Sequence, residues 1–180
     1  MELMRSVLRC RKGTAGVEAA LLLPVLITML LGLVEMSKYI EAAQRAMSAA
    51  QSVADLVTQD VTHTDASLAE IRTAARLVMA PLPTGNADLS IMIVSVGFDD
   101  QDGTPFVLWQ DPYAGTVTAD PNRATDLGDP GESVIMVTMT YNYDSPFGFL
   151  FEGRTLTEEA FSRPRITSRI ALNGKTDHEL

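Results

Sequence analysis

One uncharged, mostly apolar run near the N-terminus constrains this chain more than any other feature. The run spans Ala19–Val34 and is sixteen residues long. Beginning it at Thr14 gives about 31 Å of helix, which matches the thickness of the hydrocarbon core of a bilayer. The longer segment includes the carboxylate of Glu18, and a charge at that depth is costly unless it finds a partner. We therefore predict a single membrane-spanning helix over residues 14–36, kinked at Pro24, which cannot donate a backbone hydrogen bond.

The charges on the two sides of this run are unequal. Residues 1–13 hold four basic residues and one acidic residue, a net charge of +3, whereas the whole chain carries −9, so the remaining residues carry −12. Basic residues beside an apolar segment indicate its cytoplasmic side, and a strongly acidic domain does not bind nucleic acid by counterion release. We expect residues 1–13 to be a basic cytoplasmic leader and residues 37–180 to form a periplasmic domain. A cleaved secretory signal is disfavoured because no A-x-A site closely follows the run.

Several short signals around the apolar run occur together. Residues 12–39 read KGTAGVEAALLLPVLITMLLGLVEMSKY and combine a basic leader, Gly13, Glu18, an early proline and a Gly-x-x-Glu exit formed by Gly32 and Glu35. This pattern resembles the start of the TadE/TadG-like family, the pilin-like (pseudopilin) proteins of tight-adherence (Flp) type IV pilus systems. The resemblance covers the N-terminal segment and leaves most of the chain to be interpreted from its own residues.

The resemblance implies proteolytic processing at the beginning of the helix. In this family a prepilin peptidase is thought to cut after the glycine, which here is the bond between Gly13 and Thr14. The cut would create an ammonium at Thr14, one helical turn from Glu18, so that these charges could pair within one subunit or between neighbouring subunits. An aromatic residue usually follows the glutamate in the family, whereas this chain has Ala19. An unprocessed anchor, in which Glu18 reaches the membrane interface, is the alternative.

The resemblance also implies a function and a set of partners. The chain is expected to be a minor pilin or pseudopilin that takes part structurally in assembling a tight-adherence pilus. Its expected partners are the inner membrane, a prepilin peptidase, other pilins or pseudopilins and the pilus platform proteins. Its expected location is the inner membrane, with the N-terminus in the cytoplasm, or the extracellular pilus. The alternative is an unprocessed, membrane-anchored periplasmic binding or interaction domain.

Apolar residues continue beyond the membrane segment at the alternating four- and three-residue steps of a heptad repeat. This spacing predicts a helical extension over residues 37–60, so that one helix runs from about Thr14 to Gln59. Its packing seam faces either the chain's own domain or another subunit, the latter giving homo- or hetero-oligomers. The seam consists of Met36, Ile40, Ala43, Met47, Ala50, Ala54 and Val57.

The remaining sequence predicts an α+β domain. A second helix is expected over residues 67–80, beginning at a capping box formed by Ser67 and Glu70. His63, just upstream among polar residues, is interpreted as a solvated loop residue. Residues 89–172 form the β-rich part, in which we expect a small antiparallel sheet of three to four strands. The segments with strand character are 89–98, 105–110, 133–143 and 154–165, and the residues after Leu172 are expected to fray.

No arrangement of residues indicates catalysis, a cofactor or a metal, so the chain is not expected to be an enzyme. The acidic cluster at residues 99–102 lacks the spacing of a calcium loop and is interpreted as a solvated turn. The long segment over residues 111–132 is expected to be a functional or a mobile loop. The apolar segment PFGFLF, residues 146–151, is expected to cover a sheet edge or to touch the membrane.

The topology can be tested with reporter fusions. Four basic residues precede the membrane segment and only Lys38 lies just after it, which favours a cytoplasmic N-terminus. A reporter that is active only in the periplasm should therefore give signal when it is fused after Leu180. The matched control is a cytoplasm-active reporter at the same position, which should be silent. The opposite pair of results would reverse the predicted orientation.

Overall fold

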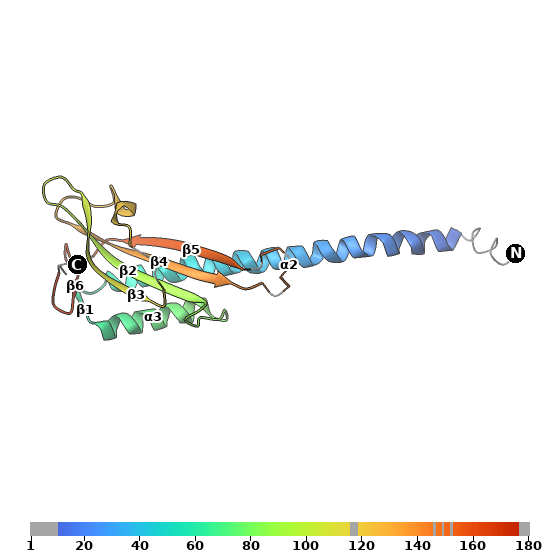
Figure 1. Cartoon of the computed structure of the whole chain (residues 1–180), viewed down its shortest axis with the longest axis horizontal. Helices are drawn as coiled ribbons and strands as arrows, with labels where there is room; N and C mark the ends of the chain where they lie inside the picture. The colour runs from blue at the N-terminus through green and yellow to red at the C-terminus, as the bar shows by residue number, and fades with distance from the viewer. Residues whose placement is uncertain (1–10, 116–118, 146, 149, 152, 177–180) are drawn as a thin grey trace, which may run out of the picture.

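A computed structural model describes residues 11–115, 119–145, 147–148, 150–151 and 153–176. One long helix projects from an α+β domain, and the beginning of this helix and the last short strand lie at opposite ends of the molecule (Figure 1). This architecture confirms the predicted fold class, with its long N-terminal helix, second helix and four-stranded antiparallel sheet. The elements are α2 (Arg11–Val57), β1 (Thr62–His63), α3 (Asp65–Met79), β2 (Leu89–Phe98), β3 (Pro105–Tyr113), η1 (Pro121–Ala124), β4 (Ser133–Tyr143), β5 (Arg154–Ser162) and β6 (Ala171–Leu172). Most of the predicted leader, residues 1–10, lies outside the described part.

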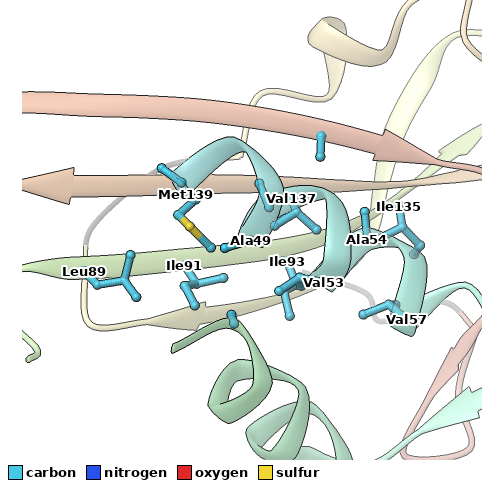
Figure 2. Packing of buried hydrophobic residues seen from close by; sticks show 14 of the residues in the cluster. Ala49, Val53, Ala54, Val57, Leu89, Ile91, Ile93, Ile135, Val137 and Met139 are labelled. Carbon is cyan, nitrogen blue, oxygen red and sulfur yellow. The ribbon is translucent and has the colours of Figure 1, made fainter. Parts of the chain in front are cut away.

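Helix α2 joins the apolar N-terminal run to the core without interruption. It continues through Pro24, whose carbonyl oxygen accepts a hydrogen bond from Thr28 Oγ1 at 2.8 Å. In its last third, small side chains face the sheet, so that the helix backbone can lie close to the strands (Figure 2). The buried apolar residues of this face are Ala42, Ala46, Ala49, Ala50, Val53, Ala54 and Val57.

The main sheet has the strand order β3-β2-β4-β5, and all its pairings are antiparallel. β2 and β3 form a hairpin, and the chain then returns so that β4 pairs with the other edge of β2. β4 and β5 form a second hairpin, whose connection lies beside α2 where the helix leaves the domain (Figure 1). β3 is therefore an edge strand, as Pro105 indicated, and it extends to Tyr113 rather than ending at residue 110.

Both faces of the central strands are buried. Alternate residues of β2 and β4, such as Ile91 and Val137, pack under α2 and α3. The residues between them, such as Val94 and Met136, pack against a second apolar cluster that includes Ala124 of η1. The described part of the long segment over residues 111–132 thus covers the second face of the sheet. Its apolar contacts explain why β4 is buried on both sides.

The structure corrects the prediction for the start of the second helix. α3 begins at Asp65, two residues earlier than expected, and its N-cap is Thr64. The capping box pairs Thr64 with Ser67 at the N3 position, so Glu70 has no part in it. His63 is buried rather than solvated, because its ring nitrogens contact the Val57 carbonyl oxygen at 2.9 Å and Ser67 Oγ at 3.1 Å. The N3 residue of the capping box is therefore Ser67 rather than the expected Glu70. Tertiary packing, which local sequence does not encode, buries His63.

The end of the chain also differs from the prediction. The last strand of the main sheet ends at Ser162, three residues before the predicted Arg165. The chain then crosses to the start of the domain, where β6 pairs in parallel with β1. Leu172 makes a further bridge to Lys175, so the segment after Leu172 begins with an ordered turn instead of fraying at once. Pairing between two such short strands depends on tertiary contacts that local sequence does not encode.

The close approach of α2 to the sheet requires small residues on the buried face of the helix. Ala49 is fully buried, whereas Met47, two residues away on the same helix, is exposed. Ala49→Leu should lower the free energy of unfolding by about 1–3 kcal/mol, because the extra carbons must displace the strands. Met47→Leu, the matched control, should change it by less than about 0.5 kcal/mol. Chemical unfolding of both variants in detergent micelles checks this, and equal stabilities would contradict the packing.

Candidate functional site

The first half of α2 presents an apolar surface in every direction around its axis. Its large side chains from Val17 to Val34 are 37% to 71% exposed, so the run has no buried face. Within the described residues, α2 is the one helix long and apolar enough to cross a membrane. An all-round apolar helix surface is typical of a membrane span, because lipid contacts every side of it. The N-terminal helix is therefore consistent with a single-pass membrane anchor.

The predicted processing residues lie at the beginning of this helix. The backbone at Gly13 and Thr14 belongs to the first turns of α2, so the bond between them is helical. Glu18 follows one turn later and is exposed. The structure thus keeps the three residues within a short stretch of one helix, in the spacing that the charge pairing requires.

The predicted packing seam divides into two parts in the structure. Its C-terminal members, Ala50, Ala54 and Val57, are buried in the chain's own core. Its N-terminal members, Met36, Ile40 and Met47, are exposed, and Ala43 between them is half-buried at the core's edge. Which surface packs against the N-terminal part of the seam therefore stays a prediction. The buried face is rotated relative to the predicted seam, because Ala42, Ala46 and Ala49 belong to it.

Glu35, the residue that follows the apolar run, is a buried carboxylate with 0% exposure. It accepts hydrogen bonds from the backbone N–H of Leu150 at 2.8 Å and of Phe151 at 3.4 Å, measured from nitrogen to oxygen. The hydroxyl of Ser145 donates to the same carboxylate. These three donors belong to the connection between β4 and β5, and we name its described residues, 144, 145, 147, 148, 150, 151 and 153, the helix-exit loop. Hydrogen bonds to a charged acceptor are strong, so Glu35 holds this loop against α2.

Aromatic side chains surround this carboxylate. Tyr39, one turn beyond Glu35, stacks on Phe151 with ring centroids 4.5 Å apart and meets Tyr143 edge-on at 5.4 Å. Burial raises the pKa of the Tyr143 hydroxyl, and the nearby Glu35 charge raises it further. An aromatic cluster thus lies near the carboxylate, whose charge is compensated by the loop's hydrogen-bond donors.

The described residues contain no group of three or more His, Cys, Asp or Glu side chains placed to hold a metal. Asp99 and Asp102 of the acidic turn accept hydrogen bonds from the backbone of Gln101 and Thr104, and they remain exposed. Backbone capping accounts for these two carboxylates. The features that stand out are therefore the apolar helix and the loop fastened to it.

Sequence reasoning identified Glu35 only as part of a Gly-x-x-Glu pattern and missed its role. A glutamate directly after an apolar run reads as the first solvated residue beyond the membrane. A second signal was available in the PFGFLF segment, because an apolar loop of that kind needs a surface to cover. Residues 146 and 149 of that segment lie outside the described part, whereas Leu150 and Phe151 contact α2.

Comparisons with known proteins match the N-terminal region. A family model described as TadE-like protein matches residues 13–55, nearly the whole of α2. This match confirms the resemblance to the TadE/TadG-like family over that segment. No curated protein and no solved structure matches the chain.

The hydrogen bonds to Glu35 can be tested by amide exchange. Glu35→Ala removes the acceptor for the amides of Leu150 and Phe151 and should speed their exchange about tenfold to a hundredfold, the range for hydrogen bonds to a charged group. Hydrogen–deuterium exchange followed by mass spectrometry measures this in the detergent-solubilised chain. Asp55→Ala, which removes an exposed carboxylate from the same helix, should leave both amides unchanged. Equal protection in the two variants would contradict the described contact.

Proposed function

We propose that this chain is a membrane-anchored, pilin-like subunit that takes part in assembling a tight-adherence (Flp) pilus. Its role is that of a minor pilin or pseudopilin and is structural rather than enzymatic. The observation that carries the proposal is the TadE-like match over residues 13–55, which coincides with α2. The matched segment contains the proposed cleavage site, the apolar run and the helical part of the core, and it ends before the sheet begins.

The proposed location follows from the helix and the charges beside it. The exposed apolar run of α2 crosses the inner membrane, with the basic leader in the cytoplasm and residues 37–180 in the periplasm. Once assembled, the subunit could also leave the membrane within the extracellular pilus. Its proposed partners are a prepilin peptidase, other pilins or pseudopilins and the pilus platform proteins.

Processing is proposed to occur between Gly13 and Thr14. Because this bond belongs to a helix, a peptidase must first unwind the local backbone to reach it. Glycine is a poor helix former, costing about 1 kcal/mol relative to alanine, so Gly13 makes the unwinding easier. The new ammonium at Thr14 would lie one turn from Glu18, which offers a countercharge within the subunit or to its neighbour.

Subunit contacts are proposed along the exposed part of the seam. Met36, Ile40 and Met47 lie on α2 beyond the apolar run and are exposed. They continue the heptad spacing of the helix, so a neighbouring helix could pack there after contacting the membrane segment. The half-buried Ala43 between them would allow a close approach. Homo- or hetero-oligomers through the N-terminal helix would result.

Processing decides between this proposal and an unprocessed anchored domain. In cells that contain the cognate prepilin peptidase, the mature chain should begin at Thr14. Gly13→Leu should leave a full-length, membrane-inserted precursor, because the larger side chain crowds the scissile backbone. Gly16→Leu is the matched control, since the space around Gly16 is open, and it should still be cut. Mass spectrometry of the N-terminus reads the result, and an intact leader in the functional protein would refute the pseudopilin role.

Glu18 should matter more for assembly than for membrane insertion. Glu18→Ala removes a carboxylate from the apolar segment, so insertion should be maintained or improved. Assembly should weaken, because a neighbour's ammonium would lose its countercharge, at a cost of about 3–5 kcal/mol where it is fully buried. Cross-linking between subunits and counts of pili measure assembly, and membrane fractionation measures insertion. Wild-type levels of cross-links and pili in the variant would argue against charge pairing.

A further inference from the structure

The helix-exit loop presents two large apolar side chains that the fold leaves uncovered. Phe147 is 51% exposed and Leu150 is 49% exposed. The loop lies beside α2 at the point where the helix leaves the domain toward its N-terminus (Figure 1). Exposed apolar side chains at such a junction are unfavourable in water and call for an apolar environment.

The contact between this loop and α2 fixes its depth along the helix. A methyl group placed on Gly32 would lie 3.5 Å from Leu150 Cδ1, so Leu150 packs directly over Gly32. Gly32 belongs to the exposed apolar run, which continues to Val34. If that run spans the hydrocarbon core, Leu150 lies level with the core's edge rather than in the water beyond it.

Four backbone amides of the helix-exit loop have hydrogen-bond acceptors, which favours this depth. The N–H groups of Phe147 and Gly148 point to Ser145 Oγ, with nitrogen–oxygen distances of 3.4 and 3.2 Å. The N–H groups of Leu150 and Phe151 are bound by the carboxylate of Glu35. Irregular backbone does not enter an apolar layer with unpaired donors, because each would cost several kilocalories per mole. The side chains of Ser145 and Glu35 accept hydrogen bonds from four backbone amides of the loop and so remove this cost for them.

The surrounding side chains have the composition of a membrane interface. Tyr39, Tyr143 and Phe151 form an aromatic layer at the level of Glu35. Lys38 comes just before Tyr39 in the sequence and is exposed, and its ammonium pairs with Glu41 at 2.9 Å. Aromatic and basic side chains of this kind mark the boundary between hydrocarbon and headgroups.

We propose that Phe147 and Leu150 insert into the edge of the hydrocarbon layer and make the helix-exit loop a second membrane contact. The ligand is the lipid surface around α2, so the inference rests on the proposed membrane span of that helix. Glu35 is the positioning residue, since its carboxylate holds the loop against the helix and satisfies its amides. Two separate contacts with the bilayer would fix both the depth and the rotation of the domain on the membrane.

Depth-dependent fluorescence quenching tests the insertion. The full-length chain is placed, one copy per disc, in lipid nanodiscs of phosphatidylcholine and phosphatidylglycerol whose acyl chains carry bromine, which quenches tryptophan on contact. Phe147→Trp adds a reporter to the loop, and Phe161→Trp adds a matched reporter at an exposed phenylalanine near the end of β5, away from the loop. Leu26→Trp adds a third reporter within the apolar run. The native Trp109 is buried and bound to the Ile170 carbonyl oxygen at 2.8 Å, so its unchanged emission shows that the domain remains folded.

The three reporters separate this inference from the proposed anchor. Phe147→Trp should lose more emission with bromine near the headgroups than with bromine at the bilayer centre, and Phe161→Trp should lose little with either. Leu26→Trp should show the opposite depth preference. Quenching of Leu26→Trp without quenching of Phe147→Trp would overturn the inference and leave the anchor intact. Absence of quenching at Leu26→Trp would refute the membrane span itself.

Removal of the positioning residue provides a second test. Adding Glu35→Ala to the Phe147→Trp variant should reduce the quenching, because the loop is no longer held at the helix, whereas adding Asp55→Ala should not. Quenching that persists unchanged without Glu35 would overturn its positioning role. An unquenched, blue-shifted Phe147→Trp emission that strengthens when several copies share one disc would show that another subunit covers the loop, and would overturn the lipid contact.

Discussion

The fold depends on the packing of the alanine-rich face of α2 against the sheet. Ala46 and Ala49 are fully buried, and their small side chains let the helix lie directly on β4 and β5. Together with α3, α2 packs on one face of the sheet, and the larger of the two apolar clusters therefore includes the helix. Helix α2, which is apolar enough at its N-terminal end to enter a membrane, therefore also forms one side of the folded domain.

One helix consequently passes through three environments along its length. Its first half is apolar on all sides, its last third buries an alanine face, and Glu35 lies between them with its charge bound by the helix-exit loop. The carboxylate at this boundary would be costly in either neighbouring environment if it were unpaired. The hydrogen bonds from Ser145, Leu150 and Phe151 all come from one connection between strands, and this explains how a polar residue can occupy the junction and hold it together.

The sequence predicted most of the architecture because the two helices and the four long strands carried strong local signals. The apolar run, the strand patterns around Ile91 and Val137 and the family resemblance of the N-terminus all led to the correct fold class. What it could not supply were contacts between distant segments. The burial of His63, the capping role of Ser67 and the binding of Leu150 to Glu35 all arise from packing that brings separate parts of the chain together. The heptad spacing located α2 correctly. An α-helix has about 3.6 residues per turn rather than the 3.5 of a heptad repeat, and the buried face follows the small alanines, so it is rotated from the predicted seam.

The continuity of α2 has a mechanical consequence. The helix spans about 70 Å at 1.5 Å per residue, and no linker interrupts it between the apolar run and the core. A hinged domain would relax independently of its anchor, whereas this one must follow every change in the tilt of the helix. The acidic turn around Asp99 and Asp102 lies at the end of the molecule far from the N-terminus, where a small angular change at the base becomes a large sideways displacement. Because α2 is continuous, a force on this end of the domain would act along the helix on its N-terminal apolar part.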